Sequence, residues 1–152
     1  MTLKRMMTVV FALALACACQ MMSFAQTDTE REAVRQAALD YVEGVYEVDA
    51  TRIERSVHPD LAKRGFYIKK GEATYSFSPM TFAELVNLAK TYNKNGRVPK
   101  DAPKEVIILD VLDQTASVKV VAVWGVDYMH LAKYDGKWMI VNILWQSPPK
   151  AK

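Results

Sequence analysis

The sequence predicts a single α+β domain, with helices in the first half of the chain and strands in the second. Two observations support this fold class. Apolar side chains recur at helical spacing through residues 29–48 and 80–93. From residue 105 onward, β-branched and aromatic runs alternate with short turn sequences. No internal repeat interrupts this order.

The first 25 residues are typical of a secretory signal peptide. Lys4 and Arg5 precede a short apolar run from Met6 to Cys19, and the small residues Ser23 and Ala25 precede the expected cleavage point. The apolar run is too short for a membrane-spanning helix. We therefore expect cleavage after Ala25 and export to the periplasm or the extracellular space.

An alternative is lipid attachment at Cys17, because "ALAC" resembles a bacterial lipoprotein box, although Ala14 stands where leucine is usual. With either outcome, residues 26–152 form the expected domain and contain no cysteine, so disulfide and thiol chemistry are excluded there. Without Lys4 and Arg5 the net charge falls from +3 to about +1. That balance gives no support to nucleic-acid binding.

Two helices are expected at the start of the domain. Thr29 and Glu32 have the spacing of a capping box, which predicts that the first helix begins at Thr29. Asp49 can cap a second, shorter helix that continues through Val57. Pro59 ends this helix, because the residue before a proline disfavours helical geometry.

The middle of the chain is predicted to hold a small hairpin and a third helix. Residues 63–78 read as two short strands around the turn "KKGE". Thr81 and Glu84 form a second capping box at the start of the third helix. Residues 93–104 contain two prolines, a glycine and several basic side chains, which is typical of a surface loop.

Four strands are expected after this loop. Residues 105–113 and 116–125 form one pair, and residues 126–134 and 137–146 form a second pair around Asp135-Gly136, a sequence that favours a type I′ turn. The strand through residues 118–124 is apolar on both faces, so both faces need cover. A partner subunit could cover one of them, which suggests a homodimer.

The final hairpin also supplies most candidate site residues. Pairing Tyr134 with Lys137 places Asp127 and His130 on opposite faces, so they cannot form a catalytic dyad without a bulge. The face that carries Asp127 is predicted to line a pocket, with Tyr67 contributed by the earlier hairpin. The pocket residues are Tyr67, Asp127, Met129, Leu131, Trp138, Ile140 and Asn142.

Simpler roles are open for the same polar side chains. Asp127 could lie in water near the strand end, while Asn142 hydrogen-bonds a neighbouring loop. His130 is expected to pack on an aromatic face or to lie at an interface.

The segments "DYVEGVYEVDATRIERSVHPDLAKRG" and "VDYMHLAKYDGKWMIVNILWQ" are similar to the putative lumazine-binding proteins, a group within the nuclear transport factor 2-like superfamily. The resemblance covers residues 29–147. It implies a cone: a strongly curved antiparallel sheet wrapped around the helices, a cavity at the open end, and dimerisation through the sheet. The superfamily includes enzymes, transport adaptors and domains with no assigned activity, and it shares its fold with ketosteroid-isomerase-like proteins, so the fold does not define a function. We predict no lumazine or flavin binding from the group's name.

Three functions remain open. The first is an exported domain that binds a small apolar or aromatic molecule without catalysis. The second is an isomerase, dehydratase or hydrolase that uses Asp127 or His58 as general base, aided by Tyr67. The third is a dimeric interaction module with a filled cavity. His58 has a simpler alternative role at the end of the second helix, where the helix dipole favours a cation.

Several chemistries lack their sequence signatures. The chain contains no HExxH, GxSxG, CxxC or glycine-rich phosphate motif. Its only histidines are His58 and His130, so we expect neither a metal site nor a cofactor.

Overall fold

The computed structural model describes residues 28–149 of the chain. The expected signal peptide and Cys17 lie outside these residues. The chain divides into two compact units, Met1–Glu32 and Ala33–Lys152, and the described part of the first unit is helical. Among the described residues, no helix is long and apolar enough to cross a membrane.

The helices largely follow their predicted starts. The first helix covers residues 28–46, so it extends at least one residue ahead of Thr29. Helix α2 (Ala50–Ser56) is capped by Asp49, whose side chain accepts a hydrogen bond from the Thr51 amide. Helix α3 (Phe82–Ala89) has the predicted capping box, with Thr81 and Glu84 bonded reciprocally.

Helix α2 ends one residue earlier than predicted, and the segment after it was predicted wrongly. Val57 pairs with Ile140 and begins a strand, so His58 lies within a strand and not at the end of a helix. Pro59 is compatible with this strand because the register between β1 and β6 is irregular between Val57 and Ala62, where proline's missing N–H breaks no ladder bond.

One six-stranded sheet holds all the strands of residues 28–149, in the order β2-β1-β6-β5-β4-β3. The α+β class and the curved, open sheet are confirmed. Four of the five strand pairings are antiparallel, but β1 runs parallel to β6. The strands are β1 (Val57–Tyr67), β2 (Ser76–Met80), β3 (Lys104–Val111), β4 (Thr115–Ala122), β5 (Gly125–Tyr134) and β6 (Lys137–Gln146).

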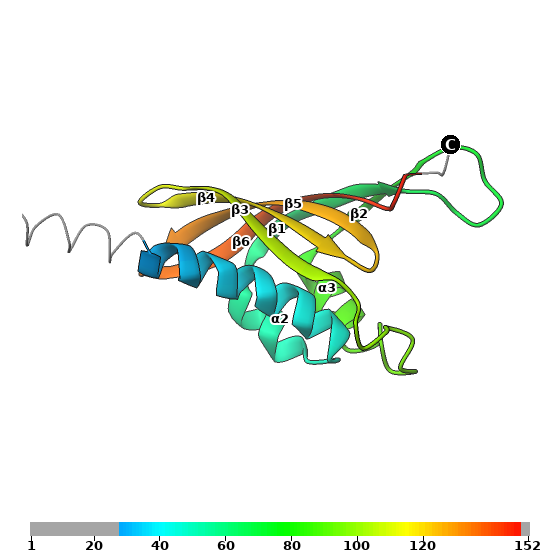
Figure 1. Ribbon diagram of the computed structural model, residues 1–152, viewed down its shortest axis with the longest axis horizontal. Coiled ribbons are helices and arrows are strands. Elements are labelled where there is room, and N and C mark those ends of the chain that lie inside the picture. Colours follow the sequence, from blue (N-terminus) through cyan, green and yellow to red (C-terminus); the bar gives the residue numbers. More distant parts are fainter. Residues whose placement is uncertain (1–27, 150–152) are drawn as a thin grey trace, which may run out of the picture. The chain divides into compact units, whose positions relative to one another are not determined.

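Within residues 33–149 the helices lie on one side of the sheet (Figure 1). The core is formed where the apolar stripe of the first helix meets the inner face of the sheet. Its largest fully buried side chains include Tyr41, Ile53, Leu85, Met129, Leu131, Ile140 and Ile143.

The β5–β6 hairpin has the predicted turn but not the predicted register throughout. Asp135 and Gly136 both have positive φ, as a type I′ turn requires, and Tyr134 pairs with Lys137. The predicted register holds as far as Leu131, opposite Ile140. A bulge then inserts one residue, so that His130 faces Asn142.

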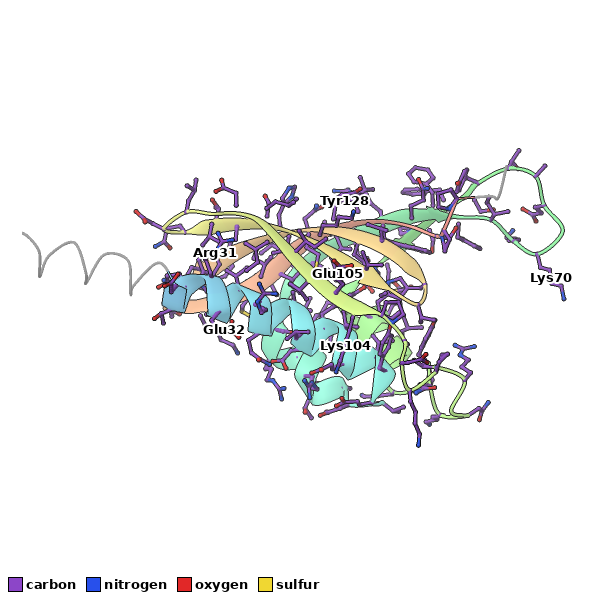
Figure 2. The ribbon with its side chains drawn as sticks, in the orientation of Figure 1. Arg31, Glu32, Lys70, Lys104, Glu105 and Tyr128 are labelled. Carbon is purple, nitrogen blue, oxygen red and sulfur yellow. The ribbon has the colours of Figure 1, made fainter. Side chains whose placement is uncertain are left out.

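Within residues 33–149 no helix covers the outer face of the sheet (Figure 1), and this face carries exposed apolar side chains. Tyr128 is 50% exposed and lies on the side of the sheet away from the helices (Figure 2). Cross-strand pairing places Leu144 beside it. We call this region the outer patch; its residues are Phe66, Phe77, Val126, Tyr128 and Leu144.

A buried carboxylate joins the first helix to α2. Asp40 accepts two hydrogen bonds from the Arg55 guanidinium, at 2.6 and 2.7 Å, and its Oδ1 lies 3.3 Å from an Arg52 nitrogen. Burial by itself raises the pKa of Asp40, but the bonds and charge of Arg55, with help from Gln36 and Arg52, lower it by more, so the net pKa lies below 3.8.

This cluster predicts an acid-dependent loss of stability. Because the native pKa of Asp40 lies below its unfolded value, the stabilisation is complete above about pH 4 and is lost as the pH falls through the native pKa. We expect Asp40→Asn to lower the free energy of unfolding by about 1–2 kcal/mol at neutral pH, with the partly exposed Arg55 limiting the size. Urea denaturation should show this difference shrinking below about pH 4. Asp101→Asn, in an exposed loop, is the control, and equal pH dependence in both variants would contradict the assignment.

Candidate functional site

An apolar cavity of about 210 Å³ lies between the helices and the inner face of the sheet. The first helix, β1, β6, the end of β2, the α3 region and the β4–β5 turn all contribute side chains to its wall. The lining residues are Tyr41, Val45, Lys63, Met80, Leu88, Tyr92, Trp124 and Trp145. Four of these eight are aromatic tyrosines or tryptophans, and Lys63 is the only charged one.

A buried ion pair lies at the floor of this cavity, where Lys63 is part of the wall and Asp127 lies behind it. The Lys63 ammonium lies 3.2 Å from Asp127 Oδ1, and the two side chains are 5% and 0% exposed. The same ammonium donates a hydrogen bond to the Tyr41 hydroxyl at 2.8 Å. That hydroxyl in turn donates a hydrogen bond to Asp127 Oδ1 at 3.4 Å. Alternation along β1 brings Leu61, Lys63 and Gly65 to the inner face, which explains why a lysine is buried here.

The second oxygen of Asp127 is also engaged. Trp124 donates its indole N–H to Asp127 Oδ2 at 2.6 Å. Trp124 is itself fixed by edge-to-face contacts with Tyr41, Tyr46 and Tyr92, at centroid distances of 5.5–6.0 Å. Asp127 therefore lies behind the cavity wall, with both oxygens bonded to residues that line it.

Burial shifts the pKa values of Lys63 and Tyr41, the two groups that bond to Oδ1 of Asp127. Desolvation lowers the pKa of Lys63 below 10.5, although the charge and hydrogen bond of Asp127 oppose it. Burial raises the pKa of Tyr41 well above 10, and the negative charge of Asp127 adds to that rise. Tyr41 therefore stays protonated and serves as a neutral bridge between the ions.

Trp145 reaches the cavity because its neighbour on β1 is a glycine. A β-carbon on Gly65 would lie 2.3 Å from the Trp145 ring, so no larger residue fits without moving β6. The Lys63 ammonium lies 5.4 Å from the centres of the Trp145 and Tyr41 rings. Trp145 also stacks on Tyr67 at 6.2 Å, and its buried indole N–H has no hydrogen-bond partner within the described residues.

Several predicted pocket residues lie on the expected face but deeper than the cavity. Asp127, Met129, Leu131 and Ile140 are almost fully buried on the inner face, where the last three belong to the core. Trp138 is buried as well, and it lines a separate hollow beside Asp40 and Arg55.

Two other placements differ from the prediction. The bulge in β6 moves Asn142 to the outer face, where it contacts His130 at 3.3 Å and accepts a hydrogen bond from Arg64 at 3.0 Å. Its predicted position beside Asp127 on the pocket face was therefore wrong. His58 does not line the cavity; its ring stacks on Tyr134 at 4.4 Å, and its Nδ1 accepts from the Asp60 amide.

None of the eight lining residues is among the predicted pocket residues, so the prediction missed the cation and all four aromatic side chains of the wall. Tyr41 lies in the apolar segment 29–48, whose spacing predicts only the buried face of a helix. Lys63 begins a segment that is predicted as a short strand. Reading residues 57–67 as one strand would have placed Lys63 inward with Leu61, and a lysine on an inward face is the signal that could have revealed the pair.

Residues 28–149 contain no cluster of three or more histidine, cysteine, aspartate or glutamate side chains that could hold a metal ion. The polar groups at the cavity are Lys63, Asp127 and the hydroxyl and indole groups around them.

A curved sheet with helices on one side and an internal cavity defines an α+β domain of the nuclear transport factor 2-like class. The model of the family described as "Putative lumazine-binding" matches residues 29–146, and the chain belongs to this family. No curated protein matches the sequence.

Solved structures agree on the fold at low sequence identity. A nuclear transport factor 2-like protein of unknown function from Silicibacter pomeroyi DSS-3 is 16% identical, with a TM-score of 0.59, covering 80% of this chain and 98% of that one. A second such protein, from Shewanella baltica OS155, is 17% identical, with a TM-score of 0.56 and coverages of 80% and 96%. A protein described as a putative scytalone dehydratase, from Novosphingobium aromaticivorans DSM 12444, is 13% identical, with a TM-score of 0.56 and coverages of 83% and 89%.

The buried pair predicts a strong asymmetry between single and paired substitutions. Lys63→Met leaves the Asp127 carboxylate buried without a cation, so we expect a loss of about 3–5 kcal/mol in the free energy of unfolding. The double variant Lys63→Met/Asp127→Asn removes both charges and keeps an acceptor for Trp124, so it should recover much of that loss. Urea denaturation at neutral pH measures both. A double variant that is no more stable than the single one would show that the two charges are not coupled.

Proposed function

We propose that this domain binds a small apolar or aromatic molecule in the cavity. The observation that supports the proposal is the wall itself: aromatic and aliphatic side chains surround a single buried polar cluster, which is the usual composition of a small-molecule site. Tyr41, Tyr92, Trp124 and Trp145 offer ring faces and edges to an aromatic ligand.

The size of the cavity limits the ligand. Pockets for drug-sized molecules measure about 300–1,000 Å³, and an apolar cavity of about 150 Å³ is enough for benzene. A cavity of about 210 Å³ therefore suits a one-ring compound with a short substituent, or a compact two-ring compound.

Lumazine fits this wall less well than a simpler aromatic does. It carries several carbonyl oxygens and ring nitrogens, and each would need a partner once buried. The described wall provides polar groups mainly at the Lys63 floor, so a bound lumazine would leave several polar atoms unpaired. The family description therefore does not determine the ligand we propose.

Catalysis is the alternative function. A general base needs an oxygen that can reach the proton it removes. Both oxygens of Asp127 are bonded to Tyr41, Lys63 or Trp124, and His58 is absent from the cavity wall. This arrangement favours binding over acid–base turnover by either residue.

Filling the cavity should abolish binding. Leu88→Trp places a larger ring in the wall, and we expect at least a tenfold loss of affinity for one-ring aromatics and indole. Leu112→Trp is the matched control, because Leu112 is 62% exposed and lies away from the cavity wall. Ligand-detected NMR with the purified protein measures both affinities. The absence of binding across the panel, or equal binding by the two variants, would refute the proposal.

We also propose that the domain is exported and forms a homodimer through the sheet. Export is supported by the basic and apolar start of the sequence. Dimerisation is supported by the outer patch, because exposed apolar side chains that adjoin across several strands are typical of protein interfaces.

Charged residues in the outer patch should separate the dimer. Tyr128→Glu and Leu144→Glu together place two like charges at neighbouring positions on the outer face, and we expect a monomer with an unchanged fold. Leu112→Glu introduces the same chemistry outside the patch and should leave the dimer intact. Sedimentation velocity distinguishes the two states. A wild-type protein that is monomeric at micromolar concentration would exclude this interface.

A further inference from the structure

We infer that the ligand is an uncharged aromatic carbonyl compound whose oxygen accepts a hydrogen bond from Lys63 Nζ at the cavity floor. The inference rests on the proposed function of the cavity and specifies its ligand. Three features of the floor lead to it: which hydrogen-bonding groups are still free, what net charge they carry, and how firmly they are held.

Two donors at the floor, on Lys63 and Trp145, lack part or all of their hydrogen-bond partners among the described residues. Asp127 already accepts bonds from Tyr41, Lys63 and Trp124. The Tyr41 hydroxyl donates to Asp127 and accepts from Lys63. An ammonium has three N–H groups, and the described contacts of Lys63 use two of them. The buried indole N–H of Trp145 is a further donor without a partner among the described residues. A ligand with an acceptor oxygen therefore complements these two donors.

The charge of the floor favours a neutral acceptor over an anion. Lys63 and Asp127 together carry no net charge. A carboxylate ligand would add an uncompensated negative charge to a cavity with an apolar wall, and a buried charge without its own counter-ion is strongly unfavourable. A carbonyl oxygen satisfies the donor and adds no charge.

The donor is already held in place. Lys63 is fixed by its bonds to Tyr41 at 2.8 Å and Asp127 at 3.2 Å, and its ammonium lies 5.4 Å from the centres of both the Tyr41 and the Trp145 rings. A ligand would therefore meet an ordered donor and lose little entropy in aligning it. The same ring faces favour an aromatic group next to the carbonyl.

The first experiment compares two ligands that differ only in the acceptor. Acetophenone and α-methylstyrene have nearly the same shape, with C=O in one and C=CH₂ in the other. In the wild-type protein, the affinity for acetophenone relative to that for α-methylstyrene includes the hydrogen bond from the ammonium. We expect this ratio to be at least tenfold lower in the double variant Lys63→Met/Asp127→Asn, because the ammonium donor is lost. Leu112→Trp, which lies outside the cavity wall, should leave the ratio unchanged. Benzoate should bind the wild-type protein at least tenfold more weakly than acetophenone.

A spectroscopic readout makes the test independent of any variant. The carbonyl stretch of bound acetophenone, followed by isotope-edited infrared spectroscopy, should lie at a lower frequency than in an apolar solvent, since a hydrogen bond weakens the C=O bond. A frequency equal to that in the apolar solvent overturns the inference.

The outcomes separate the two proposals. Binding of α-methylstyrene with no change of ratio in the double variant would overturn the carbonyl assignment and leave cavity binding in place. Tighter binding of benzoate than of acetophenone would also overturn it. Failure of both isosteric probes to bind the wild-type protein would overturn the proposed function and this inference together.

Discussion

The ion pair between Lys63 and Asp127 is the constraint that organises the interior of this domain. Two charges at less than one-tenth exposure are tolerated only when each is paired and hydrogen-bonded. That requirement joins three distant parts of the chain: the first helix supplies Tyr41, β1 supplies the lysine, and β5 supplies the aspartate. The ion pair therefore holds the residues of the cavity floor in place, and its lysine is itself part of that floor.

The β4–β5 turn and the Gly65 position depend on the same cluster. Trp124 lies at this turn and reaches Oδ2 of Asp127, and together with two of the tyrosines that it contacts, Tyr41 and Tyr92, it forms much of the wall. Trp145 can approach Lys63 closely only because Gly65 has no side chain. The aromatic wall is thus a consequence of how the buried charges are satisfied, and its shape should be sensitive to them.

The sequence predicted the elements better than the site. Capping residues are local signals, so Thr81 and Asp49 located two helix starts. The Asp135-Gly136 turn likewise determined the start of the hairpin register. The bulge near Val141 has no comparable signal, because it arises from the way β6 pairs with β1 and β5 at once.

The residue inserted by the bulge determines which side chains of β6 face the cavity and which face the outside of the sheet. It reverses the positions of Asn142 and later residues of β6, so Trp145 turns toward the helices and Leu144 toward the outside. Without it, Asn142 would share the inner face with Asp127 and would supply the floor with an acceptor as well as donors. The bulge therefore keeps the Asn142 amide out of the cavity, while it completes the outer patch with a leucine. A single irregularity in β6 thus accounts for both the chemistry expected of the ligand and the surface available to a second subunit.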